Sequence, residues 1–134
     1  MGRSNLLRLL ESVWALERRV AALLVDYELT LSQFRLLLLL KDGKPQTATR
    51  LSAALGITKA TTSALLQELT AGGRITIARN PEDRRSVLVG LSAAGKKRLR
   101  AALDGVSALE RALRRKPTPG VAEALERLGQ EDTP

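Results

Sequence analysis

The chain has 134 residues, with 22 Lys and Arg against 14 Asp and Glu, which gives a formal net charge of +8. It contains neither Cys nor His, so disulfides, zinc sites of the usual kinds and catalysis by Cys–His or Ser–His–Asp groups are excluded. The length predicts one domain.

The excess positive charge lies in the middle of the chain. Residues 31–100 hold 13 basic and 4 acidic side chains, a net charge of +9, whereas residues 1–30 are neutral and residues 101–134 have a net charge of −1. Such asymmetry favours a polyanionic partner for the middle, such as a nucleic acid. The alternative is a basic surface that only keeps the protein in solution.

No segment resembles an export signal or a membrane span. The apolar run Leu36–Leu40 is far too short to cross a bilayer, and the first residues lack the pattern of a secretory signal. We therefore expect a cytoplasmic protein without a membrane partner.

Apolar residues spaced by three and four predict a long helix over about residues 5–27. They are Leu6, Leu9, Val13, Leu16, Val20, Leu23 and Tyr27. A second apolar flank that includes Trp14 requires cover on more than one side. We interpret the helix as one that packs on its own domain and on a second subunit; the alternative is a core helix of this domain alone.

Three further helices each follow a threonine that can cap their first turn. The first opens with a Thr30–Gln33 capping box and ends at Gly43. The second is short and ends at Gly56, where a left-handed conformation allows a sharp reversal. The caps of the three helices are Thr30, Thr47 and Thr58, and the third helix covers about residues 59–71.

Residues 51–59 have the helix–glycine–helix layout of a helix-turn-helix. Small hydroxyl and amine donors crowd the start of its second helix, where a recognition helix meets bases and phosphates. The candidate DNA contacts are Thr58, Lys59, Thr61, Thr62, Ser63 and Gln67. The alternative is that a threonine-rich start only caps the helix.

A change to β-type alternation predicts a hairpin with strands over residues 74–79 and 85–91. Arg79, Arg84 and Arg85 cluster at and beside its polar tip, and such a tip is narrow enough to enter a minor groove, whose negative potential attracts arginine. Asp83 is placed to hold one guanidinium in a bidentate orientation. The alternative is an ordinary charged turn, but a basic hairpin directly after a helix-turn-helix is much rarer by chance than either alone.

The remaining sequence predicts two C-terminal helices. Ser92 can cap a helix that runs to about Lys116, with an apolar stripe that includes Leu109 and Leu113. Residues 117–120 break this helix, and residues 121–128 can form one more short helix.

Residues 51–95 resemble the winged helix-turn-helix of the MarR (multiple antibiotic resistance regulator) family. The most specific likeness is the segment Asn80-Pro81-Glu82-Asp83-Arg84-Arg85-Ser86, followed by Leu91-Ser92-Ala93-Ala94-Gly95. The resemblance implies a homodimer whose N- and C-terminal helices interlock. It also implies that the helix after Thr58 enters the major groove and that the wing reaches the minor groove, with Arg85 as the wing-tip contact that Asp83 orients.

Three positions depart from the family pattern. Ser52 and Thr62 stand where Ala and Val are usual, and Arg74 stands where an apolar residue is common, so we expect looser packing there. Because the chain lacks Cys, the thiol-based peroxide sensing of some members is excluded. Many members respond to small phenolic or anionic ligands between the dimer helices and the DNA-binding lobe, and any effector here would be non-covalent.

We therefore expect a mostly α-helical fold with a small β-hairpin wing. Residues 1–28 would form an N-terminal dimerisation helix, residues 29–91 the winged helix-turn-helix DNA-binding domain, and residues 92–134 the C-terminal dimerisation helices. The expected dimer contacts are Leu6, Leu9, Val13, Leu16, Leu109, Leu113, Val121 and Leu125.

The expected function is that of a sequence-specific regulator of transcription that binds double-stranded DNA, a repressor acting as a homodimer on a pseudo-palindromic operator. The sequence leaves open whether a small-molecule effector releases the DNA, and it predicts no cofactor and no metal. We do not expect an enzyme, since no pair of acidic residues in the basic middle has a catalytic spacing. The alternative function is a winged-helix module that binds protein or RNA without operator specificity.

Overall fold

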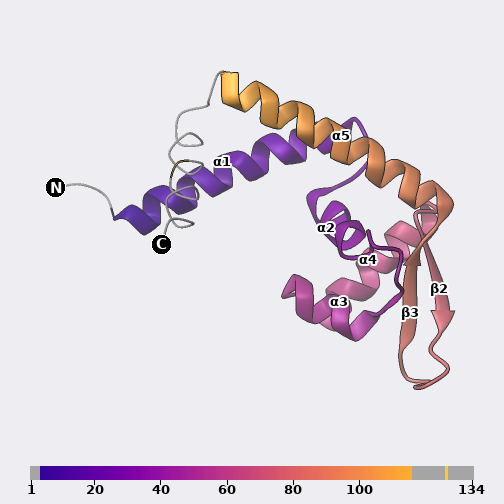
Figure 1. Cartoon of the computed structure of the whole chain (residues 1–134). Helices are drawn as coiled ribbons and strands as arrows, with labels where there is room; N and C mark the ends of the chain where they lie inside the picture. Colours follow the sequence, from indigo (N-terminus) through magenta and orange to yellow (C-terminus); the bar gives the residue numbers. More distant parts are fainter. Residues whose placement is uncertain (1–3, 116–125, 127–134) are drawn as a thin grey trace.

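The computed structural model describes residues 4–115 and 126, and it confirms a mostly helical fold with a small sheet (Figure 1). The elements in chain order are α1 (Asn5–Val25), α2 (Leu31–Leu39), β1 (Gln46–Thr47), α3 (Ala48–Leu55), α4 (Lys59–Ala71), β2 (Ile75–Arg79), β3 (Val87–Leu91) and α5 (Ala93–Arg115). Of the short helix predicted over residues 121–128 only Glu126 is described, so Val121 and Leu125 lie outside the described residues. No helix in the described part is long and apolar enough to cross a membrane.

The helices begin at the predicted caps. The Thr30 hydroxyl accepts the Gln33 N–H at 3.1 Å, and the Gln33 carboxamide oxygen accepts the Thr30 N–H at 3.0 Å, so the capping box is complete. The Thr47 and Thr58 hydroxyls likewise accept the N–H groups of Arg50 and Thr61 at the starts of α3 and α4, without the reciprocal bond of a capping box. Each cap satisfies a backbone N–H that has no partner inside its helix.

A left-handed glycine joins the two helices of the helix-turn-helix. Gly56 has φ +67° and ψ 34° at the end of α3, a conformation that costs a side-chain-bearing residue far more than glycine. The reversal brings α4 across α3, so this residue fixes how the second helix is presented.

The sheet has three antiparallel strands in the order β1-β3-β2, with Ile77 paired to Val89 across the hairpin. The predicted hairpin is therefore confirmed but incomplete, because β1 pairs with β3 on its other side. The missed strand has only two residues, too few to produce an alternating pattern in the sequence.

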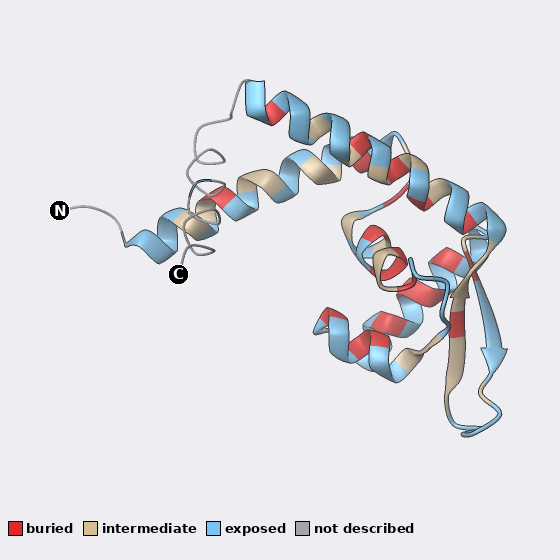
Figure 2. Ribbon diagram, in the orientation of Figure 1, coloured by how far each residue is buried: buried red, intermediate tan, exposed pale blue. Residues whose placement is uncertain are grey.

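The hydrophobic core lies where the end of α1 and the first half of α5 meet α2, α3, α4 and the sheet. Its fully buried side chains include Leu24, Leu36, Leu37, Leu40, Leu51, Leu69 and Val89. Figure 2 shows buried residues concentrated in this region, whereas most of the N-terminal half of α1 is exposed or only partly buried. The core holds α4 and the hairpin in fixed positions below the layer of α1 and α5 (Figure 1).

Candidate nucleic-acid interface

One buried face anchors α4 to the core. Leu65, Leu66 and Leu69 are buried on that face, and the burial of three leucines is worth several kcal/mol, at about 1.5–3 kcal/mol each. The opposite side and the cap carry five of the six predicted contact residues, all exposed: Thr58, Lys59, Thr61, Ser63 and Gln67.

The sixth predicted contact, Thr62, was wrong. Its side chain is 1% exposed, because it lies three and four residues before Leu65 and Leu66 on the same helix face. Its hydroxyl donates to the Thr58 carbonyl oxygen at 2.9 Å and lies 2.6 Å from the Ser52 hydroxyl. The one Thr62 hydroxyl proton is thus committed to Thr58, so Ser52 is the donor to Thr62.

The same pair overturns the expectation of looser packing at Ser52 and Thr62. Two hydroxyls stand where apolar side chains are usual, and they bond to each other across the two helices of the helix-turn-helix. No buried side-chain nitrogen or oxygen in the described residues lacks a hydrogen-bond partner. The two departures from the family pattern compensate one another.

The tip of the hairpin is a turn ordered by its own polar side chains. The Asn80 carboxamide oxygen accepts the Glu82 N–H at 3.1 Å, and its nitrogen donates to the Ser86 hydroxyl at 2.9 Å. An Asp83 carboxylate oxygen accepts the Arg85 N–H at 3.0 Å. The tip therefore has a defined shape, although it projects away from the core (Figure 1).

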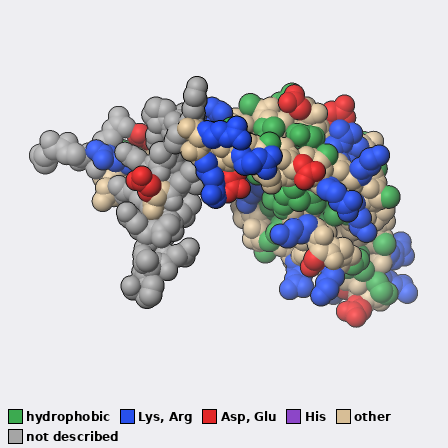
Figure 3. All heavy atoms as spheres, turned by 45° about the horizontal axis from the view of Figure 1, so that its top comes forward, with side chains coloured by type: hydrophobic (Ala, Val, Ile, Leu, Met, Phe, Trp, Pro, Cys, Tyr) green, Lys and Arg blue, Asp and Glu red, His purple; other side chains and the backbone are tan. Residues whose placement is uncertain are grey.

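The arginines of the wing are presented to solvent. Arg79, Arg84 and Arg85 are exposed, and the Arg85 side chain is 96% exposed. The predicted bidentate hold of Asp83 on a guanidinium is absent from the described tip: Arg85 Nε lies 3.9 Å from one carboxylate oxygen. Asp83 shapes the turn through the Arg85 backbone instead. On the face drawn in Figure 3, Lys and Arg side chains outnumber the acidic ones around the lower edge.

A cleft of about 490 Å³ separates α4 from the wing. Ser63, Gln67 and Thr70 of α4 line one side, and Ile77 and Val87 of the hairpin line the other. Ile77 is 43% exposed although it shares a strand face with buried Ile75 and pairs with the fully buried Val89, because β2 is an edge strand of the sheet. The sequence did not single out Thr70, Ile77 or Val87, since alternation alone does not tell which strand lies at the edge of a sheet.

A side-chain hydrogen bond ties α4 to α2. Gln33 Nε2 donates to a Glu68 carboxylate oxygen at 3.1 Å, while the Gln33 carboxamide oxygen serves the capping box. Glu68 is the only acidic residue of α4, so this bond engages the one side chain of that helix that would repel a polyanion.

The sequence model of the MarR family matches residues 27–86, which cover the helix-turn-helix, β2 and the tip of the wing. The chain carries a MarR-family winged helix-turn-helix domain. No curated protein sequence matches the chain significantly.

Solved structures with the MarR fold resemble the chain over most or all of its length. A cysteine-to-serine mutant of MarR from E. coli matches over 100% of both chains, with a TM-score of 0.82 and 24% identity. The transcriptional repressor CouR bound to a 23-mer DNA duplex matches over 91% of this chain and 87% of its own, with a TM-score of 0.76 and 25% identity. The E. coli mutant complexed with operator DNA matches over 92% and 89%, with a TM-score of 0.73 and 23% identity.

A joint, defined here as Glu28 with its partners Arg74 and Arg98, connects the MarR-family domain to the long helices α1 and α5. Glu28 sits in the left-handed region, with φ +56°, and its carboxylate lies 3.2 Å from the Arg74 guanidinium and 3.6 Å from that of Arg98. Ser92 donates its N–H to the Arg74 carbonyl oxygen and its hydroxyl to the Gly73 carbonyl oxygen. Arg74, unusual for the MarR family, thus pairs with Glu28 instead of entering the core.

The N-terminal half of α1 presents an apolar surface that nothing in the described chain covers fully. Its exposed large hydrophobic residues are Leu6, Leu7, Leu10, Val13 and Trp14. Large exposed apolar patches of this kind mark contacts with another protein or membrane surface.

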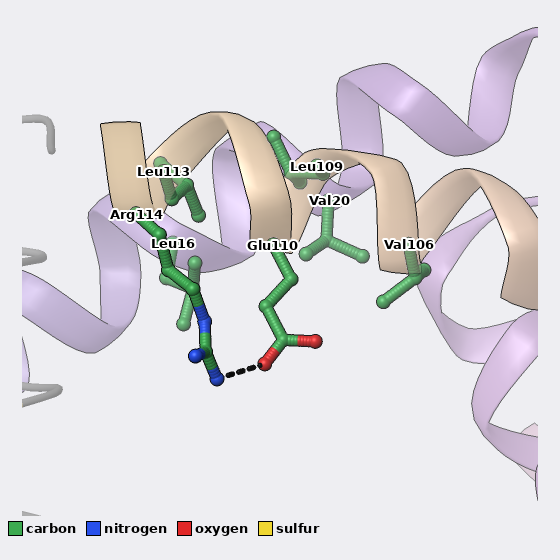
Figure 4. Close-up of a pocket in the computed structure, with 7 residues that line it drawn as sticks. All are labelled: Leu16, Val20, Val106, Leu109, Glu110, Leu113 and Arg114. Carbon is green, nitrogen blue, oxygen red and sulfur yellow. Dashed lines mark hydrogen bonds and ion pairs between the residues drawn. The ribbon is translucent and has the colours of Figure 1, made fainter. Parts of the chain in front are cut away.

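A groove of about 470 Å³ runs between α1 and α5 (Figure 4). Leu16, Leu109 and Leu113, all predicted dimer contacts, line it, and an ion pair of Glu110 with Arg114 at 2.9 Å flanks it. Leu113 is only 5% exposed, so its burial is largely complete within one chain. Among the described residues no cluster of acidic side chains could hold a metal ion.

Proposed function

We propose that this chain is a sequence-specific regulator of transcription that binds double-stranded DNA as a homodimer. The observation that carries the proposal is the pairing of two exposed features across one cleft. One is the polar outer side of α4, and the other is the arginine-bearing wing. Two solved structures with the same fold, CouR bound to a DNA duplex and an E. coli MarR mutant complexed with operator DNA, support DNA as the partner.

In the proposed complex α4 lies in the major groove and the wing reaches the adjacent minor groove. The proposed contact residues are Thr58, Lys59, Thr61, Ser63, Gln67, Arg79, Arg84 and Arg85, with Asp83 as the residue that shapes the wing turn. The cleft between them would take one sugar–phosphate strand, with hydroxyls for phosphates on one side and apolar surface for deoxyribose on the other. Thr62 is left out of this set because it is buried.

The exposed apolar half of α1 supports a dimer built from the ends of the chain. We propose residues 1–28 and 92–134 as the dimerisation parts and residues 29–91 as the DNA-binding part. Leu6, Leu9, Val13, Leu16 and Leu109 remain proposed interface residues, since each is exposed or only partly buried in one chain. A partner that enters the α1–α5 groove would complete the cover of Leu113.

A dimer would place two α4 helices about one DNA turn apart on a pseudo-palindromic operator. Occupation of a promoter would then block transcription by steric exclusion. The distance between the DNA-binding parts of the two subunits would decide whether both α4 helices fit the operator. A non-covalent effector that binds preferentially to dimers with another distance would shift the population away from the DNA-competent state.

Selection of bound fragments from genomic DNA, followed by titration at several salt concentrations, tests the proposal. We expect binding of a selected duplex to be about 10³-fold or more tighter than binding of a shuffled duplex at the same salt. We also expect sedimentation of the complex to give two chains per duplex. Equal affinity for selected and shuffled duplexes, or preference for single-stranded RNA, would overturn it in favour of a module without operator specificity.

A further inference from the structure

The outward face of α4 has a definite composition. With about 100° of rotation per helical residue, the buried side chains at positions 62, 65, 66 and 69 define one side of the helix. The residues directly opposite that side are Ala60, Ala64, Gln67 and Ala71, and all four are exposed. In a helix anchored to the core in this way, these are the side chains that would point to the floor of a DNA groove.

This face offers three methyl groups and one carboxamide, and it offers no cation. The Gln67 carboxamide makes no hydrogen bond within the described part of the chain, so both its donor and its acceptor are available. Gln33, in contrast, is engaged at both ends and holds Glu68 to the side of the helix. Lys59, the only basic residue of α4, belongs to the first turn and flanks this face.

We infer that α4 reads A·T base pairs: Gln67 binds adenine through its carboxamide, and Ala60 and Ala64 contact the 5-methyl groups of thymines. A glutamine carboxamide matches the N6 donor and N7 acceptor of adenine, and small apolar side chains contact the thymine methyl. Guanine is read most often by a bidentate Arg or Lys, which this face lacks. The inference rests on the proposed DNA-binding function and names the class of operator that it requires.

The wing supports the same class of sequence independently. Arg79, Arg84 and Arg85 are exposed at its tip, and arginine inserts preferentially into the narrow minor groove of A·T tracts. The length of the outward helix face determines how many base pairs α4 can contact directly. The seven-residue step from Ala60 to Gln67 spans about 10 Å along the helix, or about three base-pair steps at 3.4 Å each.

The test is selection of binding sites from a random duplex library by the full-length chain and by Gln67→Ala. We expect the wild type to enrich half-sites with about four consecutive A·T pairs. Gln67→Ala should lose the adenine preference at one position, by about tenfold or more in relative affinity, and keep it at the others. Ser107→Ala, an exposed change on α5, is the matched control and should leave the whole profile unchanged.

Replacement of single thymines by uracil in the selected site tests the alanine contacts separately. Loss of one contacted methyl should weaken binding about three- to fourfold, and Ala64→Ser should abolish that sensitivity at one position. Selected half-sites with a G·C core, or an unaltered base profile for Gln67→Ala, would overturn the inference while the proposed function stands. Failure of the wild type to enrich any duplex would overturn both.

Discussion

At the scale of single residues, the pair Ser52 and Thr62 shows how two departures from a family pattern become one feature. The Thr62 hydroxyl has a second partner in the Thr58 carbonyl oxygen, but the Ser52 hydroxyl would lose its acceptor without Thr62, at a cost of about 1–3 kcal/mol for a buried group left without a partner. Together they bond at 2.6 Å between α3 and α4. The sequence marked both positions as unusual, but it could not show that they face each other, because their pairing depends on the turn at Gly56.

Thr62→Val should destabilise the protein by about 1–2 kcal/mol, because it leaves the Ser52 hydroxyl without its acceptor in a buried site. The double variant Ser52→Ala with Thr62→Val should regain most of that loss, since both partners are then apolar. Urea unfolding of the two variants, with Ser52→Ala alone to complete the cycle, measures the effect. Additive losses in the double variant would show that the two hydroxyls are not coupled.

At the scale of elements, caps and glycines could be predicted far better than contacts between elements. Threonine caps act within three residues, so Thr30, Thr47 and Thr58 define helix starts from the sequence alone. The strand β1 and the joint at Glu28 could not be predicted in this way. Both depend on partners more than 40 residues away in the chain, Val89 in one case and Arg74 in the other.

In the packing of α5 against the start of the hairpin, Gly95 is the position that least tolerates a side chain. A Cβ atom there would overlap the carbonyl oxygen of Arg74, so any side chain would push the start of α5 away from the hairpin. Gly95→Ala should destabilise the fold by about 1–3 kcal/mol or more, as overpacking does, even though alanine favours a helix interior.

Thermal unfolding of Gly95→Ala beside Ala94→Ser, an exposed neighbouring change, measures this. The control should melt within a few degrees of the wild type. A Gly95→Ala variant as stable as the wild type would mean that α5 can shift away from Arg74 without cost.

At the scale of the whole molecule, charge and apolar surface divide the chain by role. The middle of the chain, with a net charge of +9, carries the wing and α4, whereas the neutral ends carry the exposed apolar half of α1. Composition could predict this division because it is a sum over many residues. It could not identify which basic side chains share one surface, since Arg74 and Arg98 are engaged by Glu28 while the wing arginines are exposed.

The location of the positive charge, rather than its amount, should set the affinity for DNA, and two triple variants of equal charge distinguish the two. One replaces Arg79, Arg84 and Arg85 of the wing by alanine, and the other replaces Arg111, Arg114 and Arg115 of α5. Affinity for the selected duplex is measured at one salt concentration after sedimentation has verified equal oligomeric state. The wing variant should bind at least about 100-fold more weakly, because groove and phosphate contacts are lost together, and the α5 variant should bind within a few-fold of the wild type. Equal losses in the two variants would show that the affinity comes from diffuse positive charge and not from contacts made by the wing.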